Sequence, residues 1–403
     1  MIAAELPSFR RLAAGAARAS GARRHHRWVR FQSSGAPKRP KTAIFFPGQG
    51  VQRVGMITPW LEAFPRTVKP IVDEIDQVLG LPLTRIIAEG PNAVLTCTEN
   101  SQPAIMATSI LILKVMEQEF GFKPAERLDF TLGHSLGEFA ALVAGGYLEF
   151  GDALKLVRQR GEVMAHCSKE ARKEGGGEYG MVALVCENED RLKAMVDGIH
   201  DFLGLSHDGS KSDSTIDIPP IAQVLIANIN SKNQIVLSGS IDRITTLLSN
   251  LRQFGGHDPR AVRLKSDSPF HSPLMKPAEK LMKKLLHDEK RSNGEDLVRF
   301  PGYMPCISNV TAKPFKSKEQ LEDLLARQAV ETVNWWDSVK YLDQEQQVKR
   351  WIGIGPGKVG RNLVGKEVGM KGEVKGGGVW GVTAPGEMEE IVKALDATET
   401  ACD

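Results

Sequence analysis

The chain has 403 residues, of which 41% are hydrophobic and 25% charged, a composition typical of globular proteins. It contains no apolar run of roughly eighteen residues, so the sequence predicts no membrane span. The net charge is +3, but residues 1–41 hold ten Lys or Arg and one acid and carry +9, so the remainder carries −6. An acidic body disfavours nucleic-acid binding. Five scattered cysteines without Cys-x-x-Cys spacing indicate a reducing compartment and no metal site.

Residues 1–41 form an Arg-rich, Ala-rich and acid-poor leader. This composition is typical of a mitochondrial transit peptide, whereas a secretory signal would need an apolar core. We therefore expect import into the mitochondrial matrix and cleavage near residues 30–34. A disordered basic arm is the alternative interpretation.

Apolar runs alternate with helical spacing from residue 42 onward. The runs predict strands at 42–46, 130–132, 181–185, 222–227, 234–237, 261–264, 304–308 and 351–354. The spacing predicts helices at about 58–79, 102–119, 139–144, 152–168, 189–199, 241–254, 274–290, 318–328 and 335–343. Pro103 would lie in the first turn of the second helix. The glycine-rich stretches 169–180 and 372–378 are predicted to be a hinge and a mobile segment.

The element order β-α-β-β-α-β within residues 179–264 predicts a small ferredoxin-like α+β subdomain. Residues 228–233 are expected to form its hairpin loop. The polar stretch 206–220 is predicted to be a disordered surface insertion. The flanking segments 42–178 and 265–397 would then form one discontinuous α/β domain.

Ser135 lies in Gly133-His134-Ser135-Leu136-Gly137-Glu138, between a predicted strand and a predicted helix. This is the nucleophile-elbow pattern, in which a sharp turn exposes a serine hydroxyl at the head of a helix. The N–H of Leu136 would be an unpaired helix-start donor, able to hold an oxyanion. A glycine-rich turn in which the serine only caps the helix is the alternative.

A serine nucleophile needs a base, and His271 is the best candidate because it lies in a Pro-flanked turn after a strand. His134 adjoins Ser135, but we expect its side chain to turn to the sheet side of the elbow. The two glycines around Gln49 permit a tight turn with free N–H groups. From the residues alone, a surface histidine and an ordinary strand-ending loop stay open for His271 and Gln49.

Eight short motifs follow one another along residues 42–368. They are Phe46-Pro47-Gly48-Gln49-Gly50, Ser101-Gln102-Pro103-Ala104, the Ser135 motif, Arg160-Gly161 with Met164, Asn228-Ile229-Asn230-Ser231, Phe270-His271-Ser272, Gln328 with Trp335, and Ile354-Gly355-Pro356-Gly357-Lys358. In this order they resemble the malonyl-CoA:acyl carrier protein transacylases, the acyltransferases of type II fatty-acid synthesis. With the leader, the resemblance points to the mitochondrial type. It implies a hydrolase-like α/β domain with a parallel sheet, interrupted by a ferredoxin-like subdomain.

The resemblance also implies roles for individual residues. Ser135 would be the acylated nucleophile and His271 its base, oriented by the backbone carbonyl of Gln328 rather than by a triad acid. The remaining implied roles are oxyanion-hole N–H groups from Gln49 and Leu136, a carboxylate-binding Arg160, and substrate-binding positions at Gln102, Asn230, His134 and Phe270. Glu331-Thr332, where the family often has proline, and the 206–220 insertion depart from the family pattern.

Malonyl-CoA and an acyl carrier protein bearing phosphopantetheine are the implied substrate and partner, with no cofactor of the enzyme's own. We expect a monomer. Four lysines on the helix after His271 would face the acidic carrier, with a solvated helix face as the alternative reading. These are Lys276, Lys280, Lys283 and Lys284.

Three other functions stay open. A serine thioesterase or lipase-like hydrolase would use the same elbow but would need an apolar acyl slot and a triad acid, and would have no use for Arg160. A transferase of methylmalonyl or another acyl unit would keep the whole machinery. A catalytically inactive homologue would serve only as a partner of the carrier protein.

Overall fold

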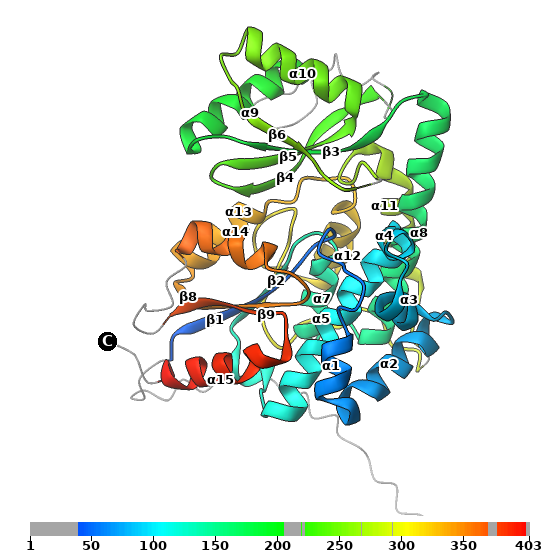
Figure 1. Ribbon diagram of the computed structural model, residues 1–403, viewed down its shortest axis with the longest axis vertical. Helices are drawn as coiled ribbons and strands as arrows, with labels where there is room; N and C mark the ends of the chain where they lie inside the picture. Colours follow the sequence, from blue (N-terminus) through cyan, green and yellow to red (C-terminus); the bar gives the residue numbers. More distant parts are fainter. Residues whose placement is uncertain are drawn as a thin grey trace, which may run out of the picture. The chain divides into compact units, whose positions relative to one another are not determined.

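The turn around Ser135 follows a strand of a five-stranded parallel sheet (Figure 1). The computed structural model describes residues 39–204, 219, 222–266, 268–291, 293–369 and 377–399. The strands, in spatial order, are β7 (Cys306–Ile307), β2 (Phe130–Gly133), β1 (Lys41–Phe46), β8 (Val348–Ile354) and β9 (Gly378–Val382). All four neighbouring pairs run parallel, so the predicted α/β fold with a parallel sheet is confirmed.

Helices cover both faces of this sheet, because alternate side chains of each strand point to opposite sides. Ile44 and Phe46 of β1 belong to a core that includes residues of α5, α7 and α15. Ala43 and Phe45 of the same strand belong to a second core with α13 and α14. Both sets are buried, which explains why residues 42–46 form an uninterrupted apolar run.

The fifteen helices of the described residues differ widely in length. They are α1 (Thr58–Ala63), α2 (Pro65–Leu79), α3 (Leu83–Glu89), α4 (Asn92–Thr96), α5 (Thr98–Phe120), α6 (Pro124–Arg127), α7 (Gly137–Ala144), α8 (Phe150–Gly175), α9 (Glu189–Leu203), α10 (Ile241–Gln253), α11 (Lys276–Asp288), α12 (Lys318–Arg327), α13 (Trp335–Lys340), α14 (Val359–Val368) and α15 (Met388–Ala397). Short helical turns lie at Pro273–Met275, Tyr341–Glu345 and Pro385–Glu387. Within the ranges described, no helix has the length and apolar character needed to cross a bilayer.

A second, antiparallel sheet forms from the middle of the chain. Its spatial order is β4 (Val224–Ser231), β5 (Gln234–Ser240), β3 (Tyr179–Val185) and β6 (Arg260–Arg263). One face packs against α9 and α10. The other face shares a small core with Met164 of α8 and Phe270, beside the base candidate His271. This sheet therefore stands over the Ser135 side of the parallel sheet (Figure 1).

Several predicted boundaries are wrong for identifiable reasons. The predicted helix 58–79 is two helices, broken at Phe64, because Pro65 lacks an N–H and starts α2. Helix α5 begins at Thr98, so Pro103 lies inside the helix rather than in its first turn. The predicted hinge at 169–180 is mostly the last turns of α8, which ends at the left-handed Gly176.

The predicted six-residue hairpin loop at 228–233 is also wrong. Strand β4 continues to Ser231 and β5 starts at Gln234, which leaves a two-residue turn. Asn228 and Asn230 of β4 both approach Nε2 of His134, at 3.4 and 2.8 Å, so their side chains leave the strand on the same side. The sequence analysis did not anticipate β9 or α15, which are short and follow a glycine-rich stretch.

Some predictions fall outside the described residues. These are the leader up to residue 38, the 206–220 insertion apart from Pro219, and most of the 372–378 segment. The described fold already includes residues assigned to the leader, because β1 begins at Lys41 and Arg39 pairs with Asp129 at 2.7 Å.

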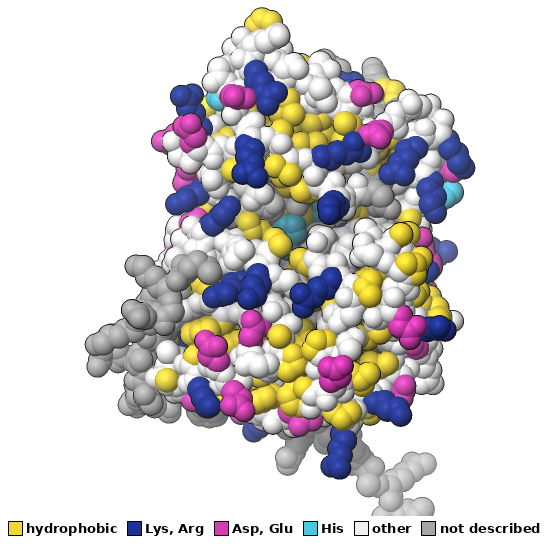
Figure 2. Space-filling model, in the orientation of Figure 1, with side chains coloured by type: hydrophobic (Ala, Val, Ile, Leu, Met, Phe, Trp, Pro, Cys, Tyr) yellow, Lys and Arg dark blue, Asp and Glu magenta, His cyan; other side chains and the backbone are white. Residues whose placement is uncertain are grey.

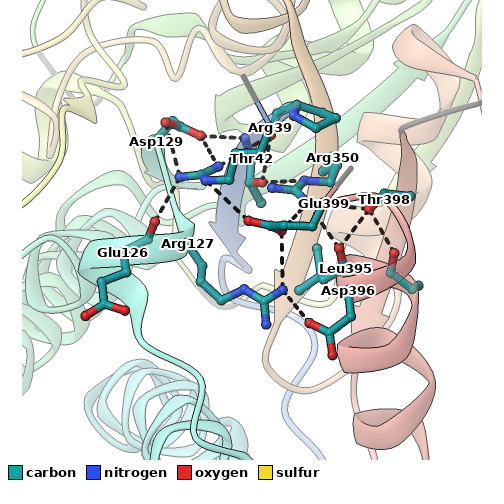
Figure 3. Close-up of polar contacts among 12 residues, drawn as sticks. Arg39, Thr42, Glu126, Arg127, Asp129, Arg350, Leu395, Asp396, Thr398 and Glu399 are labelled. Atoms are coloured by element: carbon teal, nitrogen blue, oxygen red, sulfur yellow. Dashed lines mark hydrogen bonds and ion pairs between the residues drawn. The ribbon is translucent and has the colours of Figure 1, made fainter. Parts of the chain in front are cut away.

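An ion-pair network lies at the amino-terminal ends of strands β1 and β8 (Figure 3). Arg350 of β8 is 1% exposed and donates to Glu399 at 2.9 Å and to the Thr42 hydroxyl at 2.7 Å. Arg127 pairs with Asp396 at 2.6 Å and with Glu399 at 3.4 Å. The network thus joins β1, β8 and the end of α15 at the amino-terminal ends of the strands, whereas Ser135 follows the carboxyl-terminal end of β2.

Candidate active site

Two glycines permit the turn that carries Ser135. A Cβ on Gly133 would lie 2.0 Å from the carbonyl carbon of Gly137, and a Cβ on Gly137 would lie 2.6 Å from the carbonyl oxygen of Phe46. Neither position can accept a side chain. Ser135 itself has φ 52°, a left-handed conformation that a non-glycine residue adopts only when its surroundings enforce it. The sequence pattern therefore reflects a real steric requirement.

The Ser135 hydroxyl oxygen lies 2.8 Å from Nε2 of His271. Nδ1 of His271 lies 2.8 Å from the carbonyl oxygen of Gln328 and 3.1 Å from that of Glu331. Carbonyl oxygens only accept, so Nδ1 carries the proton, Nε2 is the acceptor and the serine hydroxyl donates. The contact between Gln328 and His271 expected from the resemblance is present, and Glu331 supplies a second one that was not expected.

The electrostatic surroundings keep His271 neutral. Burial, with the positive charge of Arg160 and the nearby His134, lowers the pKa of His271 to about 3. A neutral imidazole at physiological pH is the form that can take a proton from a hydroxyl. His271 also has φ 55°, so both members of the Ser135–His271 pair stand on backbone held in a sparsely populated conformation.

Two backbone N–H groups lie free beside the hydroxyl. In the described part of the chain, neither Leu136 nor Gln49 donates its backbone N–H to another residue. Leu136 is the N-cap of α7, where helix donors lack an internal partner. The N–H of Ser135, by contrast, is bound by Oδ1 of Asn309 at 2.7 Å. Among the described residues, both donors that the resemblance assigns to an oxyanion hole are thus free.

A cavity of about 430 Å³ opens over Ser135 and His271. Figure 2 shows a hollow between the part of the molecule that carries α9 and α10 and the rest, with histidine atoms at its floor and Lys or Arg side chains around it. The lining includes six of the candidate site residues from the sequence analysis: Gln49, His134, Ser135, Asn230, Phe270 and His271.

His134 is turned toward the cavity, so the expectation that it faces the sheet side is wrong. Its Nε2 donates to Oδ1 of Asn230 at 2.8 Å, and its ring packs on Trp335 at a centroid distance of 5.4 Å. A Cβ on Gly48 would lie 2.8 Å from Nδ1 of His134, so this ring packs directly against the Gly48–Gln49 backbone.

Arg160 is 1% exposed and does not line the cavity. Its terminal nitrogens donate to Oε1 of Gln102 at 2.7 Å and to Oε1 of Gln328 at 2.8 Å, while its Nε has no partner in the part of the chain described. Burial lowers the pKa of Arg160 to about 10, and the charge of Glu138 opposes this shift. The arginine is therefore still charged at neutral pH, in a desolvated site whose partners are neutral amides.

Sequence reasoning missed Glu138 and Asn309, which support the turn from behind. Asn309 donates to the carbonyl oxygen of Gly133 at 2.7 Å, in addition to accepting from Ser135. Its own N–H donates to Glu138, which is fully buried. Burial raises the pKa of Glu138 to about 7, against hydrogen bonds from Gln328 and Asn309 and the charge of Arg160. Glu138 could have been noticed as an acid within an apolar helix.

The four lysines of α11 do not line the cavity. Lys276 and Lys283 both pair with Glu279, at 2.7 and 3.1 Å, and Lys283 also pairs with Asp323. The basic residues at the cavity are instead Arg263 and Lys265, at the end of β6. The structure thus brings together Ser135, His271, Gln49, Leu136, Gln328, Arg160, Gln102, Asn230, His134 and Phe270, but not the lysine face.

This arrangement supports nucleophilic acyl transfer. The Ser135 hydroxyl, the neutral His271 and Gln49 line one cavity, and Leu136 follows Ser135 directly with its N–H unpaired within the described ranges. Among the described residues, backbone carbonyls rather than a triad carboxylate contact Nδ1 of the histidine. Where the chain is described, no group of three or more His, Cys, Asp or Glu is placed to hold a metal ion.

Comparisons with known proteins agree with this chemistry. Residues 44–200 match the family model described as an acyl transferase domain. The chain is 37% identical over 326 residues to the malonyl CoA-acyl carrier protein transacylase of Bacillus subtilis (strain 168). The matched stretch covers 81% of this chain and 90% of that protein. A similar enzyme of Escherichia coli (strain K12) is 31% identical over 79% of this chain and 89% of its own length.

Solved structures give the same answer. The acyl-carrier-protein S-malonyltransferase of Bartonella henselae matches with a TM-score of 0.70 and 30% identity, over 88% of this chain and 99% of that one. A malonyl-transacylase in complex with a type II PKS acyl-carrier protein matches with a TM-score of 0.69 and 28% identity, over 88% and 99%. This chain is thus an acyltransferase that belongs to the malonyl CoA-acyl carrier protein transacylase family.

Proposed function

We propose that the enzyme transfers a malonyl group from malonyl-CoA to the phosphopantetheine thiol of an acyl carrier protein, through a malonyl-serine intermediate. The observation that carries this proposal is the 2.8 Å contact between the Ser135 hydroxyl and Nε2 of a neutral His271, beside two free N–H donors. The relatives named above, which carry the same activity in their names, support it.

The first half-reaction acylates the serine. Nε2 of His271 takes the Ser135 proton as the oxygen attacks the thioester carbonyl, and the N–H groups of Leu136 and Gln49 bind the developing oxyanion. The carbon–sulfur bond then breaks, and the CoA thiolate takes the proton from His271. The carrier thiol repeats these steps in reverse order, giving a malonyl thioester and free Ser135. A thiolate is a good leaving group, so a Ser–His pair suffices.

Arg160 is the residue that would select malonyl over a neutral acyl group. A guanidinium can bind a carboxylate with two parallel hydrogen bonds. In this structure Gln102 and Gln328 occupy its terminal nitrogens with amide oxygens. A malonyl carboxylate would replace one of these neutral acceptors by a charged one, which strengthens the contact in a desolvated site.

We place the carrier protein over the cavity mouth, because its phosphopantetheine thiol must reach Ser135. Arg263 and Lys265 lie at this mouth and would attract an acidic carrier. The lysine face on α11 stays a prediction. Two variants compare the α11 lysines with the Arg263–Lys265 segment: Lys280 and Lys284 both changed to Glu, and Lys265→Glu alone. The surface that docks the carrier is the one whose variant loses transfer to the carrier but keeps acylation by malonyl-CoA.

The composition of residues 1–41 favours mitochondrial import, and the mitochondrial matrix is then where the enzyme would serve fatty-acid synthesis. Fusing residues 1–41 to a fluorescent protein tests the import alone. Diffuse cytosolic fluorescence would reject this location and leave the activity untouched.

The function itself is tested by intact-mass analysis after mixing the protein with malonyl-CoA. We expect a gain of one malonyl group in the wild type and no gain in Ser135→Ala, followed by its loss when carrier protein is added. Release of free malonate instead of transfer would indicate a thioesterase. Acylation by acetyl-CoA at an equal rate would indicate a transferase of other acyl units, and no acylation by any acyl-CoA would indicate an inactive homologue.

A further inference from the structure

The side chain of Gln328 makes three hydrogen bonds and is completely buried. Its Oε1 accepts from Arg160 at 2.8 Å, and its Nε2 donates to the carbonyl oxygen of Ser135 at 2.8 Å and to Glu138 at 2.7 Å. The amide has only one workable orientation, because its oxygen must face the guanidinium and its nitrogen must face two acceptors. Three neighbours thus determine the position of this side chain.

The same residue contacts the base through its backbone, since its carbonyl oxygen accepts from Nδ1 of His271. One residue therefore contacts the arginine, the turn that carries the nucleophile and the base. Gln102, the other partner of the Arg160 guanidinium, contacts neither Ser135 nor His271 by any hydrogen bond between described residues.

We infer that Gln328 is a positioning residue whose side chain holds the Arg160 guanidinium at a fixed place relative to the Ser135 turn. It thereby sets the preference for acyl groups bearing a carboxylate. Gln328 does not touch substrate in this scheme. It acts through Arg160, and Glu138 keeps its amide in the required orientation. The inference rests on the proposed function, in which Arg160 binds the malonyl carboxylate.

The test is the malonyl-to-acetyl ratio of kcat/KM for acylation of Ser135, followed by intact mass in single turnovers of the full chain. Gln328→Met keeps the backbone carbonyl and the side-chain volume but removes the amide. We expect this ratio to fall by about 10- to 100-fold, the range for one hydrogen bond to a charged group. In an Arg160→Met background, adding Gln328→Met should change the ratio by less than about twofold, because the coupled partner is gone.

A second variant approaches the same amide from its far side. Glu138→Gln keeps the shape but replaces the acceptor of Gln328 Nε2 by an amide that can donate, which favours a flipped Gln328 whose nitrogen faces Arg160. The ratio should fall here too, although Glu138 lies behind the turn. If Gln328→Met does not fold, this variant decides. Gln320→Met is the matched control and should leave the ratio unchanged. Gln320 lies on α12, the helix that Gln328 caps, and among the described residues it is bonded to Lys316 and Ser317.

The outcomes separate the two proposals. If the wild type is not malonylated, or if Arg160→Met leaves the ratio unchanged, the proposed function of Arg160 fails. If both behave as proposed but Gln328→Met and Glu138→Gln lower malonyl and acetyl transfer equally, the coupling is wrong and Gln328 only stabilises the turn.

Discussion

Replacing Arg160 by methionine tests what makes this site a malonyl site. Methionine keeps most of the apolar stem and removes the guanidinium, whose central carbon lies 5.8 Å from the centroid of the Phe139 ring. At 1% exposure the guanidinium is desolvated, and its two hydrogen bonds of 2.7 and 2.8 Å show that both terminal nitrogens are aimed at acceptors. In the proposed function the guanidinium forms a desolvated charge pair with the malonyl carboxylate. Truncating one partner of a desolvated charge pair costs roughly 2–5 kcal/mol, about 30- to several-thousand-fold in rate.

We therefore expect Arg160→Met to lose malonyl transfer by that factor and to keep or gain acetyl transfer, because no unpaired guanidinium then opposes a neutral acyl group. The assay is the ratio of kcat/KM for malonyl-CoA and acetyl-CoA. Arg158→Met is the matched control: Arg158 lies two residues earlier on α8 and pairs with Glu162 at 2.6 Å. A ratio that is the same in Arg160→Met, Arg158→Met and wild type would show that Arg160 is structural and would refute the reasoning.

Three further predictions concern the base, its protonation and the opposite edge of the sheet. Ser135→Ala and His271→Ala should each lower transfer by several orders of magnitude and the double variant little further, because the two act as a unit; multiplicative losses in rate assays would argue against a coupled pair. Since burial lowers the pKa of His271 to about 3, the base stays neutral down to acidic pH, and kcat/KM should show no histidine midpoint near neutrality. If kcat/KM does show a midpoint near neutrality, it should come from Glu138, whose pKa is about 7. A midpoint near neutrality that persists in Glu138→Gln would contradict this assignment. Glu399→Gln removes the carboxylate beside the buried Arg350; because Glu399 is 37% exposed, we expect a loss of only roughly 1–2 kcal/mol and a Tm a few degrees lower. Burial raises the pKa of Glu399, but the hydrogen bond and charge of Arg350 outweigh burial and hold this pKa below its usual value. The stabilisation by the ion pair is therefore present at neutral pH and is lost as the pH falls through the folded-state pKa. A Tm difference between wild type and variant that does not shrink on acidification would count against the ion pair.

The sequence was informative wherever a short stretch carries its own physical requirement. Gly133 and Gly137 mark the turn because any Cβ there would overlap backbone atoms, and this requirement can be read from the pattern alone. The apolar run at 42–46 indicates a strand buried on both faces for the same local reason. Boundaries were less certain, since the end of α8 depends on where a left-handed glycine becomes available rather than on where polar residues begin.

Only the tertiary structure decided how the site is held together. Ser135 and Asn309 are 174 residues apart in the sequence, and His271 and Gln328 are 57 apart, so no periodicity relates them. The direction of His134 follows from Trp335 and Asn230, which reach it from other elements. The amide orientation of Gln328 follows from three partners on two separate segments, the turn at Ser135–Glu138 and helix α8. Residue types are thus set locally, whereas the direction of a side chain depends on the elements packed against it, and these meet only in the folded chain.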